Sequence, residues 1–253
     1  MIFNFKPKPL VVHCIVSEEM SHVYDYAPIQ PANKFFPTWW KASAKTTIDW
    51  EDTNLKQSIK NCQGIQDHYG QGMIMPMWSD LAISTNGSGG IVSQFSDMIS
   101  TNDYQGTDIR SGFRPDAINM KLQSPWRFRS DKDVYWNFLG VYWDQLERPN
   151  WEVMPGTLEF YYNYGTNVNM LVDVTKGHAM INHGQPLAHF FPLSERPLVI
   201  KNEMVSNREF DILCNNTRAI SFINKYKTIR KAKRASDDEQ AKAKCPFGFG
   251  SKK

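Results

Sequence analysis

The chain has 253 residues, of which 41% are hydrophobic and 22% charged, and this composition excludes a disordered or fibrous protein. No apolar run approaches the roughly 18 residues of a membrane-spanning helix. Residues 1–9 carry lysines and two prolines where a signal peptide needs an apolar stretch, so we expect a protein that neither spans a membrane nor is exported.

The first part of the chain predicts one strand and two short helices. Residues 10–16 are apolar and mostly β-branched, which is typical of a strand. Pro37 precedes two tryptophans, and a proline at the first turn predicts a short helix that starts near it. Apolar residues at helical spacing over 59–69 predict a second helix, which ends near Gly70.

Residues 73–203 predict the strand-rich core. Strands are expected up to residue 95, with a glycine-rich turn at 86–90, and a long polar loop is expected over 96–118. The remaining strand candidates are 120–123, 126–130, 134–143, 151–154, 157–162, 167–174, 178–182, 187–192 and 197–203. Short strands at this spacing favour a mainly β (α+β) fold: an antiparallel sandwich, barrel or β-clip with flanking N- and C-terminal helices.

The C-terminal part predicts helices. Ser206 and Glu209 form a capping-box pattern at the start of an apolar stripe, which indicates a helix packed on the sheet. A basic helix is expected over 225–244, followed by a flexible tail. We therefore expect one globular domain over 1–224 and a separate segment over 225–253.

Charge is distributed unevenly between these two parts. Residues 225–253 hold ten basic and three acidic side chains, a local charge of +7, whereas the rest of the chain carries −4. A basic segment of this kind can hold nucleic acid or an acidic partner, and it can equally be a solvated helix with a frayed end.

Cysteine and histidine positions argue against a metal centre. The four cysteines lie far apart and form no C-x-x-C pair: Cys14, Cys62, Cys214 and Cys245. We expect reduced, mostly buried thiols in a cytosolic compartment. Three histidines fall within twelve residues, at His178, His183 and His189, but no paired carboxylate lies nearby. Structural or surface roles for them, and no metal, are therefore expected.

Aromatic residues make up 13% of the chain. Most should point into a β-rich core, since large rings bury extensive apolar area. The alternative is a surface on which sugars or bases stack, built on pairs such as Trp39–Trp40 and Tyr161–Tyr162.

Residues 155–192 carry the most specific local pattern. Gly156 opens a turn that leads through Glu159 to Tyr161 and Tyr162, and Gly184 opens a second turn 28 residues after Gly156. This stretch resembles the β-clip hairpin of trimeric dUTPases, and residues 248–251 resemble the glycine-rich C-terminal arm of that family.

The dUTPase resemblance implies a set of roles. Glu159 would take the place of the aspartate that orders the attacking water, and Phe249 would stack on the base. The implied ligand contacts are Tyr161, Tyr162, Gly248, Phe249, Gly250 and Ser251. Mg²⁺ would be needed only for this nucleotide hydrolase. The family's Arg-Ser-Gly phosphate motif has no counterpart here; the nearest material is 128–132.

A wider resemblance covers most of the chain. The segments that carry it are 35–41, 74–80, 124–126, 165–169 and 192–196. They resemble an uncharacterised family encoded by T4-like phages of marine bacteria, with bacterial relatives. The resemblance implies a phage protein located in the host bacterial cytoplasm or in the virion.

Three functional hypotheses follow. The first is a non-catalytic binding, assembly or virion-associated factor, because no catalytic set is complete. The second is a dUTPase-like pyrophosphohydrolase with Glu159 as general base. The third is a carbohydrate-binding module.

We expect a homo-oligomer, because β-clip proteins often close their sheet edges by assembling. A phage or host protein partner and nucleic acid bound by residues 225–253 are further expectations, and no membrane partner is expected.

Overall fold

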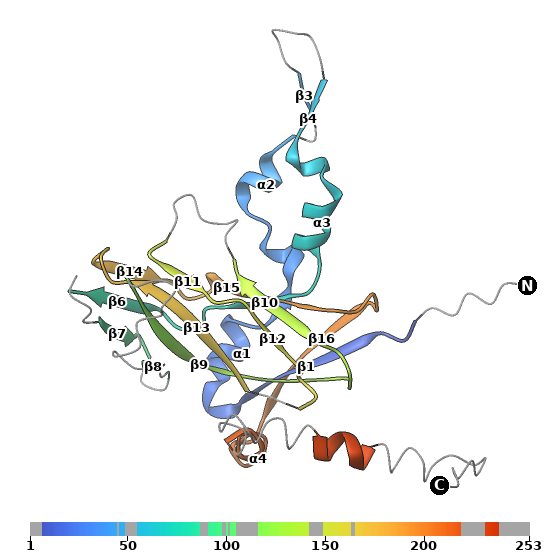
Figure 1. The fold of residues 1–253 in the computed structure, drawn as a ribbon, viewed down its shortest axis with the longest axis vertical. Helices are drawn as coiled ribbons and strands as arrows, with labels where there is room; N and C mark the ends of the chain where they lie inside the picture. The colour runs from blue at the N-terminus through green and yellow to red at the C-terminus, as the bar shows by residue number, and fades with distance from the viewer. Residues whose placement is uncertain are drawn as a thin grey trace, which may run out of the picture.

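The computed structural model describes residues 7–44, 46–48, 55–86, 91–97, 100, 102–104, 116–141, 149–162, 165–218 and 231–237. Its fold is mainly β, with several sheets and a few short helices, which confirms the predicted fold class (Figure 1). Two larger sheets contribute to one hydrophobic core, and an arm built from short helices and a hairpin extends away from them.

The first large sheet has six strands. In spatial order it contains β11 (Trp151–Val153), β13 (Gly165–Asp173), β9 (Ala117–Ser130), β1 (Leu10–Ser17) and β16 (Leu198–Val205), and β8 (Asn102–Tyr104) pairs with β9. Its pairs are antiparallel except for β1 and β16, which run parallel. An antiparallel sheet was expected, and this parallel pair corrects that expectation. Local sequence patterns do not reveal the pairing, because the two strands lie near opposite ends of the chain.

Strand β9 also differs from the prediction. Two separate strands were expected at 120–123 and 126–130, but they form one strand of 14 residues. Its register with β13 shifts between Gly165 and Asn167, opposite the segment that contains Pro125. Proline has no backbone N–H and is tolerated in a strand at such a bulge. A loop was expected over 96–118, but part of this range forms β8, which pairs with β9. Residues 105–115 lie outside the described part.

The second large sheet has five strands and shares the core with the first. Its order is β12 (Gly156–Leu158), β10 (Trp136–Gly140), β15 (Pro186–Pro192), β5 (Met73–Pro76) and β2 (Gln30–Pro31). Trp126, Trp136 and Trp151 are buried in the core that the two sheets form, which confirms the prediction for these tryptophans. Trp143 lies outside the described residues.

A three-stranded sheet lies beside the larger ones. It contains β14 (His178–Ile181), β6 (Leu81–Thr85) and β7 (Ile91–Phe95), in that order. Strand β6 alternates buried and exposed residues, so Leu81 and Ile83 join the main core while the other face meets solvent.

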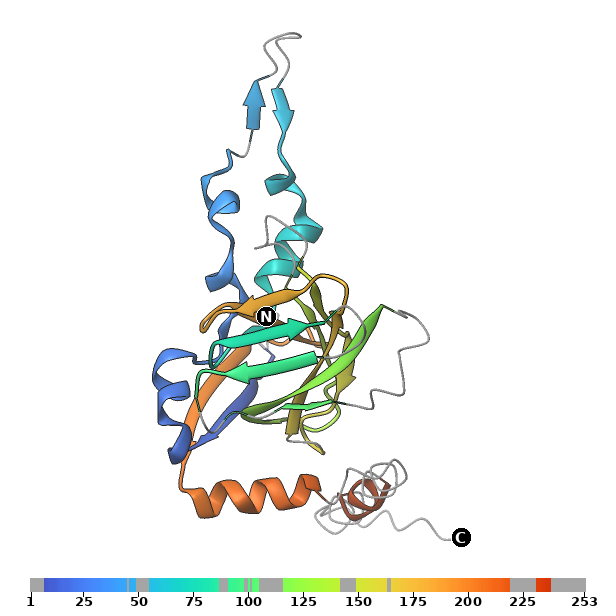
Figure 2. The ribbon, with the colours of Figure 1, turned by 90° about the vertical axis from the view of Figure 1, so that its left-hand side faces the viewer.

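The described residues of the range 38–70 form the arm. It contains α2 (Thr38–Ala42), β3 (Thr46–Ile48), β4 (Leu55–Gln57), the 3₁₀ turn η3 (Ile59–Asn61) and α3 (Gln63–Gly70). Helix α2 starts directly after Pro37 and α3 ends at Gly70, as predicted. Figures 1 and 2 show that the arm projects from the sheets and carries the β3–β4 hairpin at its far end.

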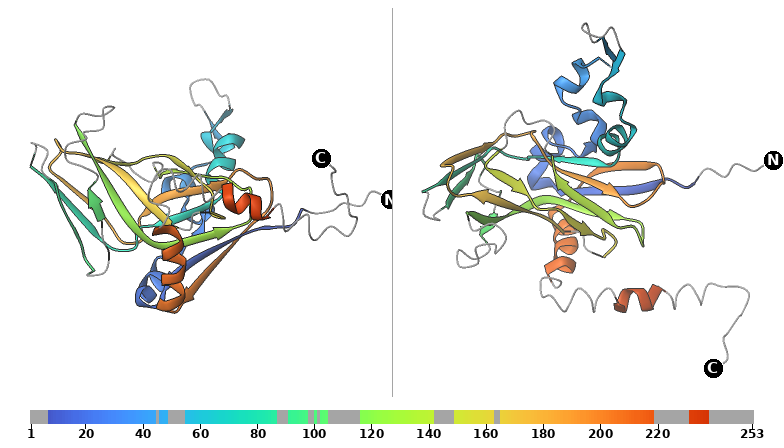
Figure 3. Two further views of the ribbon diagram at one scale, coloured as in Figure 1. Left: turned by 60° about the horizontal axis from the view of Figure 1, so that its bottom comes forward. Right: turned by 45° about the horizontal axis from the view of Figure 1, so that its top comes forward.

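The remaining helices flank the body. They are η1 (Glu18–Met20), α1 (Ser21–Tyr26), η2 (Ala32–Phe35), α4 (Asn207–Arg218) and a helical segment over 231–237. Ser206 and Glu209 form the predicted capping box, because the Glu209 N–H donates to Ser206 Oγ at 3.4 Å and the Ser206 N–H donates to Glu209 Oε2 at 3.2 Å. Both α4 and segment 231–237 lie on the side opposite the arm (Figure 3).

Candidate functional site

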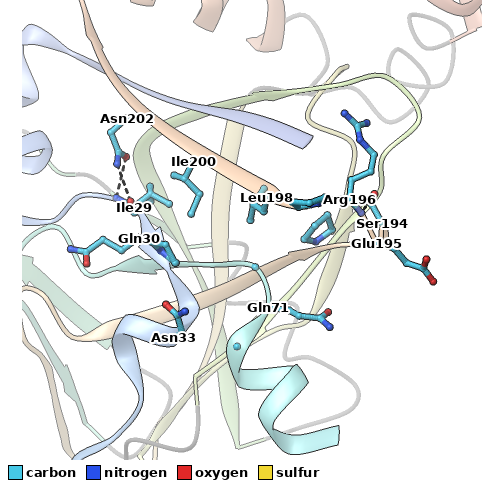
Figure 4. Close-up of a pocket in the computed structure, with 15 residues that line it drawn as sticks. Ile29, Gln30, Asn33, Gln71, Ser194, Glu195, Arg196, Leu198, Ile200 and Asn202 are labelled. Atoms are coloured by element: carbon cyan, nitrogen blue, oxygen red, sulfur yellow. Dashed lines mark hydrogen bonds between the residues drawn. The ribbon is translucent and has the colours of Figure 1, made fainter. Parts of the chain in front are cut away.

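A groove separates the edges of the two large sheets at the base of the arm. Strand β16 is the edge of the six-stranded sheet and β2 is the edge of the five-stranded one. The space between them has a volume of about 630 Å³ and is lined by 15 residues, shown in Figure 4. We call it the edge groove.

One wall of the edge groove is the open side of β16. The Pro197 carbonyl faces β1, because it accepts a hydrogen bond of 2.8 Å from the Leu10 N–H. Successive residues of a strand direct their backbone polar groups to opposite edges, so Leu198 and Ile200 direct theirs into the groove. An open strand edge of this kind offers a ladder of N–H and C=O groups to a further strand.

The opposite wall comes from β2, η2 and the end of α3. Gly72 brings this wall close to β15: its φ is +78°, and a Cβ atom built on it would lie 2.1 Å from the Phe190 carbonyl oxygen. The Gly72 carbonyl accepts a hydrogen bond of 3.1 Å from the Ala32 N–H, which ties η2 to the chain that follows α3. The width of the groove therefore depends on glycine at this position.

Asn202 closes one end of the edge groove. Its side-chain amide donates to the Ile29 carbonyl at 2.9 Å and accepts from the Ile29 N–H at 3.2 Å (Figure 4). The asparagine thus pairs with a backbone as a neighbouring strand would. Ile200 and Leu198, on the same strand, also line the groove, so the rest of this wall is the unpaired edge.

The groove is almost neutral. Its charged lining residues are Glu195 and Arg196, and the Arg196 guanidinium is held by Asp131 at 2.6 Å and by the Pro9 carbonyl at 2.7 Å. Amide side chains, backbone groups and aliphatic or proline side chains make up most of the rest. The 15 lining residues include neither histidine nor cysteine.

A second cavity continues this surface onto the arm. It has a volume of about 330 Å³ and lies against α2 and α3, where Trp40, Lys60 and Asp67 line it. Asn33 and Gly70 line both cavities, so the two hollows meet at these residues. A concave surface therefore runs from the open edge of β16 to the arm.

Stacked aromatic rings hold the arm to the body. Phe36 stacks on Trp40 of the arm with ring centroids 5.5 Å apart, and within the arm Trp40 meets Tyr69 edge to face at 5.6 Å. His68 on α3 contacts His189 on β15 at 5.3 Å, also edge to face. Each such pair adds about 1 kcal/mol to the burial of its rings, so the base of the arm is firmly attached.

His189 makes this attachment sensitive to pH. Burial lowers its pKa from 6.5 to about 4, the hydrogen bond with the Gln71 carbonyl opposes this shift, and the nearby His68 adds to it. The folded state therefore holds neutral His189 where the unfolded chain would bind a proton. This contribution to stability is complete above pH 6.5 and is lost as the pH falls towards 4.

We predict that acid weakens the fold through His189. Between pH 7 and pH 4.5 it should account for a loss of about 2 kcal/mol in the free energy of unfolding. Urea titrations at the two pH values measure this loss, and His189→Gln should show a smaller one. His183→Gln is the matched control, because His183 lies in an exposed turn. Equal losses in the two variants would contradict the prediction.

The structure brings Glu159, Tyr161 and Tyr162 together in the turn after β12, next to the helical segment 231–237. Glu159 is 1% exposed, and the Arg234 guanidinium lies 3.5 Å from its Oε1. The Tyr161 hydroxyl donates to Asp237 at 3.2 Å, while Tyr162 is buried. The implied partners at 248–251 lie outside the described residues, so their meeting with Glu159 stays a prediction.

The three clustered histidines separate as the strand pattern indicates. His178 lies on β14, His183 in a turn and His189 on β15. Within the described ranges, no group of three or more His, Cys, Asp or Glu side chains is placed to hold a metal ion. Cys14 and Cys214 are buried thiols and Cys62 is an exposed one.

Neither aromatic pair forms a flat stacking platform. The ring planes of Trp39 and Trp40 meet at 77°, and those of Tyr161 and Tyr162 at 88°. A sugar or base stacks best on rings that lie in one plane, so these pairs offer little for the carbohydrate-binding alternative.

Sequence reasoning did not find the residues that shape the groove. The sequence pattern around Asn202 could have indicated its role. Asn202 follows Leu198 and Ile200 on the inward face of a predicted strand, where a side-chain amide needs a hydrogen-bond partner. Asn33 and Gln71 have no such pattern around them, since they lie in irregular segments that only the tertiary fold brings to β16. Arg234 was one of many basic residues in its segment.

Comparison with protein-family models, curated proteins and solved structures finds no match for this chain. Among the residues that the structure describes, no helix is both long and apolar enough to cross a membrane.

Proposed function

We propose that this protein is a non-catalytic binding or assembly factor that holds an extended segment of a protein partner in the edge groove. The observation that carries the proposal is the open edge of β16 along one wall of a groove that continues onto the arm. An extended peptide added to such an edge gains main-chain hydrogen bonds, and side pockets select its side chains.

The chemistry of the lining supports a peptide over a charged metabolite. The Arg196 guanidinium is engaged by Asp131 and backbone carbonyls, so it is not available to hold a phosphate or carboxylate. Amides and carbonyls with apolar side chains between them match a polypeptide backbone with alternating side chains. We infer that the partner is a phage or host protein, as the wider resemblance would imply. Homo-oligomerisation through the same open edge is a further part of this proposal.

The arm supports an assembly role. Its β3–β4 hairpin has three residues in each strand and lies at the end furthest from the sheets (Figure 2). A two-stranded hairpin alone is marginally stable in water, so a partner surface that covers it would stabilise it.

The proposal predicts that one substitution at the meeting point of the two cavities abolishes peptide binding. Peptides selected from a random display library on the full chain should lose affinity at least about tenfold in Asn33→Trp, because the larger indole takes up space in the two cavities that Asn33 lines. Lys34→Trp is the matched control, since Lys34 is the exposed neighbour and lines neither cavity. Fluorescence anisotropy measures both affinities.

A second substitution tests the role of the backbone. Ile200→Pro removes an N–H that points into the groove, and proline is tolerated on an edge strand. Affinity for the selected peptides should fall, while circular dichroism reports an intact fold. The proposal is wrong if no peptide is enriched, or if the enriched peptides bind both groove variants as tightly as the unchanged chain.

A further inference from the structure

A compact cluster of acidic and aromatic side chains lies against the helical segment 231–237. Glu159, in the turn after β12, forms its floor and is 1% exposed. Asp133, in the turn between β9 and β10, stands at its rim with φ of +60°, the one positive φ outside glycine among the described residues. Tyr162 forms its wall. We call these three residues the arginine socket.

The arginine socket contacts Arg234 on three sides. The Arg234 Nη2 atom lies 3.5 Å from Glu159 Oε1 and 3.4 Å from Asp133 Oδ1. Its Nε donates to the Tyr162 hydroxyl at 3.4 Å, and its Cζ lies 5.9 Å from the centre of that ring. Hydrogen bonding to Tyr162 is the main influence that raises the pKa of Arg234 above its ordinary value.

The shape of the socket favours a guanidinium over an ammonium group. Arg234 uses two nitrogens here, because Nη2 lies near both carboxylates while Nε donates to the phenol hydroxyl, and a guanidinium can do this while it also lies against a ring. Placing a buried carboxylate such as Glu159 beside a second acid is costly unless a cation lies between them. Lysine would supply the charge but not the planar set of donors.

Arg234 reaches the socket on a short helical segment, 231–237. This segment follows residues 219–230, which lie outside the described part of the chain. Asp237 attaches its other end, accepting from the Tyr161 hydroxyl at 3.2 Å and pairing with Lys132 at 3.3 Å. The Arg234 side chain is still 42% exposed, so the segment rests on the surface through a few polar contacts.

We propose that Glu159, Asp133 and Tyr162 form a binding site for an arginine side chain on a peptide, and that Arg234 is a tethered occupant which an arginine of another chain can replace. The tether gives Arg234 an effective concentration in the millimolar range, so the site is occupied in cis until a competing peptide is abundant or binds tightly. This inference uses none of the residues that line the edge groove.

The test uses the full-length chain and a fluorescent peptide that spans residues 229–240. In Arg234→Gln the tethered side chain no longer competes, so the peptide should bind at least about tenfold more tightly than to the unchanged chain. Lys231→Gln is the matched control: it makes the same charge change on the exposed side of the same segment and should behave like the unchanged chain. Anisotropy titrations give the affinities.

Two further comparisons test the chemistry of the site. A peptide with lysine in place of Arg234 should bind Arg234→Gln at least about tenfold more weakly than the arginine peptide. Adding Asp133→Asn or Glu159→Gln to Arg234→Gln should weaken arginine-peptide binding by a similar factor. Asparagine tolerates the positive φ at position 133, so this variant decides the matter if the change at Glu159 prevents folding.

The proposal is overturned if Arg234→Gln binds the peptide no better than the unchanged chain, or if the lysine peptide binds as well as the arginine peptide. Binding that survives both socket substitutions in a folded chain would also overturn it, because the peptide would then be held elsewhere.

Discussion

Replacing Gly72 with alanine is expected to lower the free energy of unfolding by about 3 kcal/mol or more. The new Cβ atom would lie 2.1 Å from the Phe190 carbonyl oxygen and 2.9 Å from the Phe191 Cα, and both neighbours are backbone atoms that cannot rotate away. The residue also has a φ of +78°, which alanine adopts only with strain. Thermal unfolding followed by circular dichroism should show a midpoint about 10 °C lower.

Gly177→Ala is the matched control for this prediction. Gly177 has nearly the same φ, +75°, but no atom lies within 4 Å of the position that a Cβ would take. Alanine there should cost only the backbone strain, about 1 kcal/mol. If the two variants lost the same stability, the close approach of Gly72 to β15 would not be the reason why glycine is needed at this position.

Replacing Phe190 with alanine is expected to cost about 3–5 kcal/mol. The Phe190 ring is fully buried and stacks on Phe138 with centroids 5.3 Å apart. It also meets Phe128, from the other large sheet, at 5.6 Å, so its loss opens a cavity between the two sheets. Urea unfolding should show a lower midpoint with an unchanged slope, which is the mark of lost stability in an intact fold.

Leu193→Ala serves as the control for Phe190. Leu193 is three residues further along the chain and is 58% exposed, so its truncation should change the free energy of unfolding by no more than about 0.5 kcal/mol. A small effect at Phe190 would contradict the assignment of a shared core to the two sheets.

The two proposed binding surfaces make separate demands on the molecule. The edge groove depends on the open side of β16 and on the arm base, whereas the arginine socket depends on two turns that contact segment 231–237. Asn33→Trp should therefore leave peptide binding at the socket unchanged, and Asp133→Asn should leave the groove intact. The nucleotide-hydrolase alternative stays a prediction, and in the described structure its candidate base, Glu159, is paired with Arg234.

Local features of the structure could be predicted because they depend on neighbouring residues. The helix after Pro37, the end of α3 at Gly70 and the capping box of α4 each depend on residues within one turn. The buried tryptophans of the strands follow from side-chain alternation, which has a period of two wherever one face meets a core.

The sequence by itself determined the fold class, the main elements and the aromatic character of the core, since composition and periodicity act locally. Only the tertiary structure decided that β16 pairs in parallel with β1 and leaves its other edge open. It also placed Asn33 opposite β16 and Arg234 against Glu159. These contacts join segments far apart in the chain, and their choice depends on how the whole core packs.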